Sequence, residues 1–161
     1  MKKTLILIII GIILVVAIGG GIVIFKLLNK EKTPISASEF NTTMKNEGYV
    51  MTDTTDQFAR YGDAVLKSYA AQKSGYQIEF YELSTEENAI SMYNTNKSKF
   101  ESEKANVSSS TTSNMKNYST YSLNTNGTYK YLSRIDNTLV YVDVDEDYKD
   151  DVKEIMKEIG Y

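Results

Sequence analysis

Residues 118–145 read YSTYSLNTNGTYKYLSRIDNTLVYVDVD, which divides into three strand-like segments separated by two short turns. β-Branched and aromatic residues are frequent in segments 118–125, 128–135 and 138–145. The dipeptides Asn126-Gly127 and Asp136-Asn137 can supply the positive φ angles of tight hairpin turns. This stretch therefore predicts a three-stranded antiparallel meander.

A second group of strands is predicted upstream, at residues 49–55, 65–72 and 76–83, with a turn at Lys73-Ser74-Gly75. Three one-sided helices complete the pattern, at residues 36–48, 84–104 and 147–159, and the first begins at a capping box of Ser36 and Glu39. We expect an α+β domain in the order α-β-β-β-α-β-β-β-α, with a mainly antiparallel sheet and helices on one face.

The N-terminal residues 5–25 are apolar and uncharged, and as a helix they would extend about 31 Å, close to the hydrocarbon thickness of a bilayer. We expect a cytoplasmic head at residues 1–4, a transmembrane signal-anchor helix at 5–28, a linker at 29–34 and one soluble domain at 35–161. Within that domain, the Ser/Thr/Asn-rich residues 105–117 are expected to form a flexible loop.

A cleaved signal peptide is the alternative interpretation, since Ala17-Ile18-Gly19 offers small residues at the spacing of a cleavage site. Against cleavage, the apolar run continues to Phe25. The basic residues on the two sides of the span nearly balance, so charge alone does not fix the orientation. Because the head is short, we expect it to stay inside and the domain to be extracytoplasmic.

The chain has no histidine and no cysteine. Ser-His-Asp and Cys-His catalysis and metal sites built on these residues are therefore impossible within it. The formal net charge is −3, and five lysines with a single glutamate precede Pro34, so the domain itself is more acidic than the whole chain. Nucleic acid is a poor candidate partner, and so is anionic lipid for the domain as a whole.

The acidic run near the C-terminus matches part of a calcium loop. Its candidate ligands occupy loop positions 1, 3, 5, 9 and 12, namely Asp143, Asp145, Asp147, Asp151 and Glu154. Tyr148 replaces the glycine that such a loop needs, and residues 140–144 alternate as a strand. Solvent-facing strand residues and acidic residues at a helix N-terminus explain the same sequence, so no metal or other cofactor is expected.

Two further patterns resemble catalytic ones only in spacing. Ser113 and Lys116 form S-x-x-K without its companion motifs, and Glu79 with Glu82 could pair as glycosidase carboxylates in any acidic domain.

Tyrosines are abundant on the predicted strands, and those at Tyr121, Tyr129, Tyr131 and Tyr141 are candidates for an interaction surface. We therefore expect a single-pass, membrane-anchored extracytoplasmic protein of the bacterial cell envelope that acts as a non-catalytic interaction module for an envelope protein, peptide or glycan. The alternative is a small enzyme or Ca²⁺-dependent module that uses the acidic cluster at residues 143–154.

Overall fold

The N-terminal helix of the domain begins where the capping box predicts it. In the computed structural model, which describes residues 31–161, the Ser36 hydroxyl accepts a hydrogen bond from the Glu39 backbone, and the Glu39 carboxylate accepts one from the Ser36 backbone. Helix α2 then runs over Ala37–Asn46. The predicted head and membrane span lie outside the described residues. None of the helices in residues 31–161 combines the length and the hydropathy that a membrane span requires.

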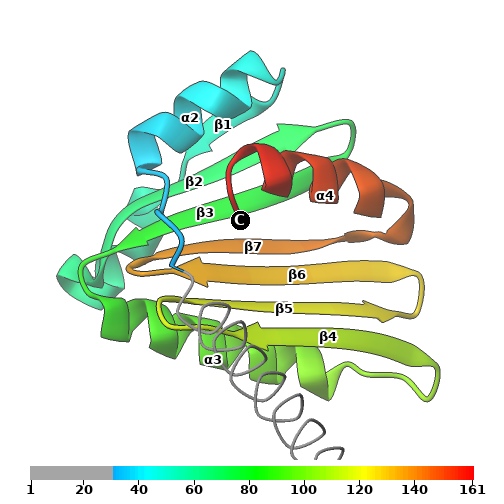
Figure 1. Cartoon of the computed structure of the whole chain (residues 1–161). Coiled ribbons are helices and arrows are strands. Elements are labelled where there is room, and N and C mark those ends of the chain that lie inside the picture. Colours follow the sequence, from blue (N-terminus) through cyan, green and yellow to red (C-terminus); the bar gives the residue numbers. More distant parts are fainter. Residues whose placement is uncertain (1–30) are drawn as a thin grey trace, which may run out of the picture. The chain divides into compact units, whose positions relative to one another are not determined.

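Seven strands form one antiparallel sheet in the order β1-β2-β3-β7-β6-β5-β4 (Figure 1). Their bounds are β1 (Val50–Asp53), β2 (Val65–Lys73), β3 (Tyr76–Leu83), β4 (Ser108–Asn114), β5 (Tyr118–Thr125), β6 (Thr128–Ile135) and β7 (Thr138–Asp145). Both predicted strand groups are present. The meander β5-β6-β7 has the predicted bounds, because its turns are set by local residues such as Asn126 at φ 49° and Gly127 at φ 76°.

Strand β4 lies where the sequence predicted a loop, so the order contains one more strand than expected. Its seven residues pair in register with β5, from Ser108 opposite Thr125 to Asn114 opposite Ser119. Nearly all of its side chains are exposed. Strand β4 forms in spite of its polar composition, because an edge strand is held by backbone hydrogen bonds and does not have to bury apolar side chains.

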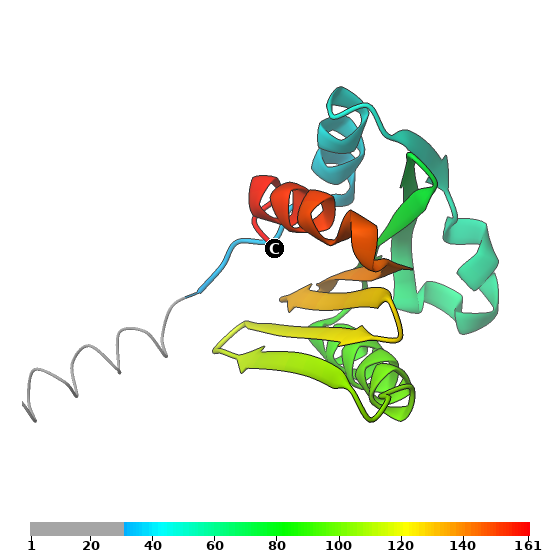
Figure 2. The same ribbon diagram turned by 90° about the vertical axis from the view of Figure 1, so that its right-hand side faces the viewer.

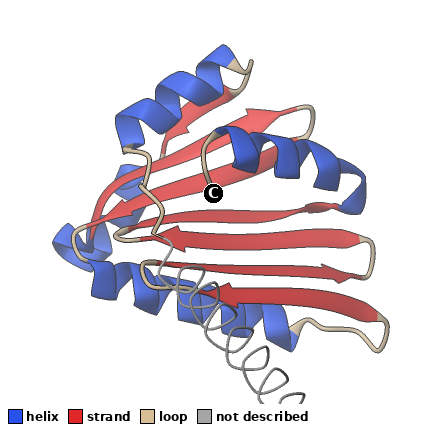
Figure 3. Cartoon of the chain, in the orientation of Figure 1, coloured by secondary structure: helices blue, strands red, loops and turns tan. Residues whose placement is uncertain are grey.

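The helices cover both faces of the sheet, so the expectation that they lie on one face is wrong (Figures 2 and 3). Helices α2 and α4 (Lys149–Glu158) pack on one side, called here the α4 face. Helix α3 (Glu86–Ser102) and the 3₁₀ segment η1 (Thr55–Ala64) pack on the other, the α3 face. A short 3₁₀ turn, η2 (Glu146–Tyr148), leads from β7 into α4.

Two apolar clusters explain this arrangement. The α4 face buries Phe40, Phe80 and Val142, while the α3 face buries Phe100 and Leu139. The central strands therefore carry apolar residues on both sides, as in β7, and each side needs a helix to remove it from water.

Candidate binding cleft

The two central strands, β3 and β7, separate at one end of the sheet. Their ladder pairs Ile78 with Val142 at that end and Glu82 with Thr138 at the other. Beyond Glu82, the Leu83 backbone N–H donates to the Asn137 carbonyl at 2.8 Å, and the Asn137 side-chain amide donates to the Leu83 carbonyl at 2.7 Å. One end of the ladder is therefore closed by Asn137, and the other end is open.

The open end leaves backbone polar groups facing the gap. In an antiparallel ladder, every second residue bonds to a given neighbouring strand. Leu83 and Asn137 are hydrogen-bonded to each other, so every second residue from them along β3 and β7 should also face the other strand. This alternation makes Gln77 and Asp143 the next pair that would exchange hydrogen bonds. The ladder stops one position short of them. Their N–H and C=O groups are therefore directed between the strands.

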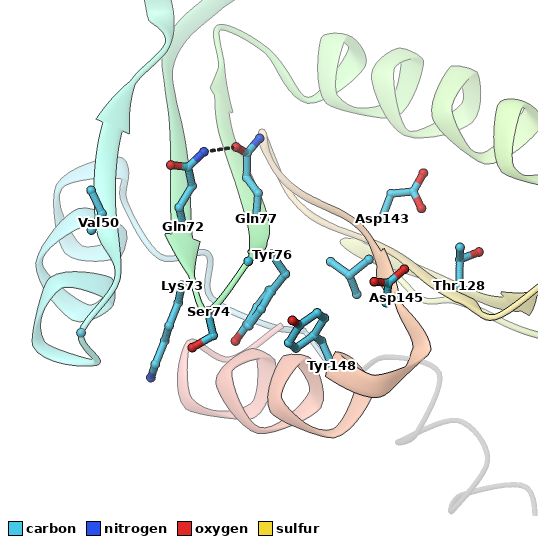
Figure 4. Close-up of a pocket in the computed structure, with 13 residues that line it drawn as sticks. Val50, Gln72, Lys73, Ser74, Tyr76, Gln77, Thr128, Asp143, Asp145 and Tyr148 are labelled. Carbon is cyan, nitrogen blue, oxygen red and sulfur yellow. Dashed lines mark hydrogen bonds between the residues drawn. The ribbon is translucent and has the colours of Figure 1, made fainter.

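A cleft of about 1080 Å³ occupies this position (Figure 4). Its walls come from the β2–β3 hairpin, the end of β7 and η2, with contributions from the starts of β1 and β6. They comprise Gly48, Val50, Gln72, Lys73, Ser74, Gly75, Tyr76, Gln77, Thr128, Asp143, Val144, Asp145 and Tyr148. This volume is slightly above the range of about 300–1000 Å³ that is usual for ligand sites. It is sufficient for a short segment of polypeptide.

Stacked tyrosines form one wall of the cleft. The rings of Tyr76 and Tyr148 have centroids 4.7 Å apart and are inclined by 29°. The Tyr76 hydroxyl shares a hydrogen bond of 2.6 Å with the Tyr49 hydroxyl. Burial raises the pKa of both Tyr49 and Tyr76, so these phenols remain neutral. The wall can pack against apolar or aromatic groups, but it supplies no phenolate base.

Amide side chains line the opposite side of the sheet at the same end. Gln72 Nε2 donates to Gln77 Oε1 at 2.9 Å, and Gln77 Nε2 donates to Glu79 Oε1 at 2.8 Å. The Tyr81 hydroxyl in turn donates to Glu79. This chain of hydrogen bonds fixes the orientation of the Gln77 amide beside the cleft.

The surroundings of the cleft are acidic. Asp143 and Asp145 line it, and an adjoining hollow of about 370 Å³, which shares Lys73 and Tyr76, is bordered by Glu47, Asp151, Glu154 and Glu158. An acidic rim favours neutral or cationic ligands and disfavours phosphate groups.

Asp143 is already engaged by a buried lysine. Lys130 Nζ lies 2.6 Å from Asp143 Oδ2 and 2.7 Å from Glu103 Oε2. Burial opposes the charge of Lys130, but the hydrogen bonds from both carboxylates hold its pKa above the usual value. Lys130 in turn lowers the pKa of Glu103. This cluster anchors the β7 side of the cleft to β6 and to the end of α3.

The five calcium candidates do not converge. Asp143 is bound to Lys130, Asp147 lies in η2, and Asp151 and Glu154 lie on α4 beside the second hollow. Asp145 follows Asp143 at a spacing of two on the strand and therefore shares its face. Among residues 31–161, no group of three or more His, Cys, Asp or Glu side chains is arranged to hold a metal ion.

The four tyrosines proposed from the sequence divide between the two faces. Tyr129 and Tyr131 lie on the α4 face with ring centroids 6.4 Å apart, and Tyr129 is only 4% exposed. Tyr121 is 1% exposed and, like Tyr141, packs into the cluster on the α3 face. The structure therefore does not bring the four together. The sequence did not predict that Tyr76 and Tyr148 form a site. The two residues are far apart along the chain, and only the placement of the β2–β3 turn next to η2 brings their rings together.

The structure also does not support the two patterns that resemble catalytic ones in spacing. Ser113 lies on strand β4 and not on a helix, so one helical turn does not bring Lys116 to it. Glu79 and Glu82 stand at odd and even positions of β3 and point to opposite faces.

Comparison with family models, with curated protein sequences and with solved structures found no match to this chain.

Proposed function

We propose that the chain is a single-pass, membrane-anchored extracytoplasmic protein of the bacterial cell envelope, and that its domain is a non-catalytic module that binds an extended peptide segment of a partner protein. The anchoring rests on the uncharged apolar residues 5–25. The non-catalytic role is supported by the absence of histidine and cysteine from the sequence.

The observation that carries the peptide proposal is the open end of the β3–β7 ladder. Gln77 and Asp143 direct backbone donors and acceptors into the cleft at strand spacing. An extended peptide presents matching N–H and C=O groups, as in recognition by β-augmentation. A peptide entering the cleft would complete the hydrogen bonding that the two strands do not provide for each other.

Side chains define the class of peptide. The Tyr76–Tyr148 stack offers an aromatic wall, while Asp145 and the four carboxylates of the adjoining hollow favour basic residues. We therefore expect a segment with at least one apolar side chain and one lysine or arginine.

Photocrosslinking of the full chain in native membranes tests this proposal. A benzophenone amino acid at Gln72, on the exposed rim of the cleft, should give a discrete protein adduct, and the same group at exposed Ser98 on α3 should not. Asp145→Lys, at an exposed position of the rim, should reduce the adduct by reversing the charge. Equal adducts from both positions, or an adduct that Asp145→Lys leaves unchanged, would contradict the proposal.

A further inference from the structure

Helix α4 carries opposite charges on its two flanks. Lys149, Lys153 and Lys157 follow one another at intervals of four residues and therefore share one side of the helix. Lys149 Nζ lies 5.8 Å from the Tyr129 ring centroid, which places this flank toward β6. The acidic residues Asp151, Glu154 and Glu158 instead border the hollow beside α2 and the β2–β3 hairpin.

The lysine flank borders a groove that also contains the start of the described domain. The groove has a volume of about 350 Å³ and is lined by Lys32, Tyr129, Tyr131, Lys153, Met156, Lys157, Gly160 and Tyr161. Lys32 Nζ donates to the Gly160 carbonyl at 2.9 Å and lies 5.2 Å from the Tyr118 ring centroid. The chain therefore enters the domain on the same flank as the three α4 lysines.

Acidic neighbours neutralise this flank only weakly. Glu146 lies 3.8 Å from Lys149, and Asp150 lies 3.3 Å from Lys153 with its side chain 94% exposed. Exposed pairs of this kind contribute little free energy, so the lysines remain available to other anions.

Beyond the lysines, the α4 face continues as an uncharged surface. The strand register places Ser109, Thr111 and Ser113 of β4, and Tyr118, Thr120, Ser122 and Asn124 of β5, on this face. Within residues 31–161 no helix covers these two strands on this side, whereas α3 packs on the other face (Figures 1 and 2). Tyrosine and lysine are residue types that favour the interface between a bilayer and water.

We propose that this surface, made of Lys32, the three α4 lysines and the α4-face side chains of β4 and β5, docks on the anionic lipid headgroups of the bilayer in which the chain is anchored. The proposal rests on the proposed anchoring. Six residues separate position 25 from Lys32, and even when fully extended this stretch of chain spans at most about 25 Å, so a domain anchored in this way stays within reach of the headgroups. The acidic flank is repelled by the same headgroups, so docking leaves the peptide cleft accessible.

The overall acidity of the domain does not oppose this docking, because the charges are separated in space. Basic groups within a Debye length of an anionic membrane are attracted individually. Each lysine near the membrane surface increases the ratio of docked to undocked domain about fivefold. Three lysines, two of them weakly paired, should together contribute about tenfold to a hundredfold.

The absence of cysteine makes a direct test possible. The full chain is reconstituted in vesicles of phosphatidylcholine, with or without phosphatidylglycerol, carrying a single cysteine labelled with an environment-sensitive dye. Thr111→Cys reports from the docking face, and Thr112→Cys, the next residue of the same strand, reports from the opposite face. We expect protection from a water-soluble quencher at position 111 only, in anionic vesicles only, and its loss at high salt.

Charge variants complete the experiment. Lys149→Gln, Lys153→Gln and Lys157→Gln combined should lower the docked-to-undocked ratio about tenfold to a hundredfold, whereas Asp151→Asn, Glu154→Gln and Glu158→Gln combined should not lower it. Equal quenching at positions 111 and 112 in anionic vesicles, or protection that survives the lysine variant, would overturn the docking. Failure of the chain to float with neutral vesicles would overturn the anchoring as well as the docking that depends on it.

Discussion

Gln77 and Asp143 face each other across the open end of the β3–β7 ladder without pairing, although each belongs to a strand that is fully bonded on its other side. The aromatic stack of Tyr76 and Tyr148 lies beside this gap. Tyr76 and Tyr148 therefore stabilise the fold and also line the cleft in which a ligand would bind. Substitutions of these and other tyrosines can distinguish the two roles.

Tyr148→Ala should remove the stack on Tyr76 and expose part of its ring. We expect a loss of about 1–2 kcal/mol in the free energy of unfolding together with a loss of the crosslink from position 72. Tyr148→Phe keeps the stack and should retain both. Urea unfolding monitored by circular dichroism measures the stability. Tyr61→Ala, at a tyrosine that is 54% exposed, is the control and should change stability by less than about 0.5 kcal/mol.

Removal of two buried tyrosine hydroxyls should have opposite effects on the free energy of unfolding. The Tyr121 hydroxyl has no hydrogen-bond partner among residues 31–161, so Tyr121→Phe should leave stability unchanged or raise it by up to about 1 kcal/mol. Tyr49→Phe removes the hydrogen bond to Tyr76 and should cost about 1 kcal/mol. Chemical denaturation of the two variants side by side gives the comparison. A larger loss for Tyr121→Phe than for Tyr49→Phe would contradict it.

Lys130→Met should destabilise the domain by about 1–2 kcal/mol, because Asp143 and Glu103 would then lose their shared cation. The cost stays below that of a fully buried ion pair because both carboxylates reach water. Lys67→Met removes the cation from Asp53 at the surface and should lower stability less than Lys130→Met does, because solvent screens this exposed pair. Urea midpoints of both variants test the difference, and equal values would show that burial of Lys130 has no energetic role.

Acid should lower the free energy of unfolding of the domain, and protonation of Asp53 should account for part of the loss. Hydrogen bonds from Lys67 and Thr55 lower the pKa of Asp53 to about 2 from the usual 3.8. Its contribution to stability is therefore fully present above about pH 4 and is lost as the pH falls toward 2. Asp53→Asn should reduce the dependence of the urea midpoint on pH in this window, and Asp63→Asn, at an exposed position of η1, serves as the control. Identical pH dependence in the two variants would exclude Asp53 as a contributor.

Calcium should not raise the melting temperature. The five candidate ligands lie on separate elements, and Asp143 is paired with Lys130. Thermal melting with added calcium and with a chelator should give the same midpoint. A calcium-dependent rise that Glu154→Gln abolishes would restore the ion-dependent alternative.

Secondary structure was predicted well where local residues decide it. The helix start at Ser36 and the turn at Gly75 depend on residues within four positions of each other, and both were predicted. Strand β4 was missed because its polar side chains carry no alternating pattern, and only its pairing with β5 makes it a strand. Helix α3 begins at Glu86, two residues after the predicted start at 84, because Thr85 accepts the capping hydrogen bond from the Asn88 backbone N–H.

The sequence by itself determined which chemistry is impossible, because histidine and cysteine are absent, and it determined the meander and the apolar N-terminal run. Only the tertiary structure decided that Tyr121 and Tyr131 face opposite sides, that Lys130 is buried between two carboxylates, and that Gln77 and Asp143 meet at an open ladder end. Hairpin turns and helix caps depend on neighbours along the chain. Strand register and the end of a ladder depend on residues far apart in the sequence, so no local pattern encodes the cleft.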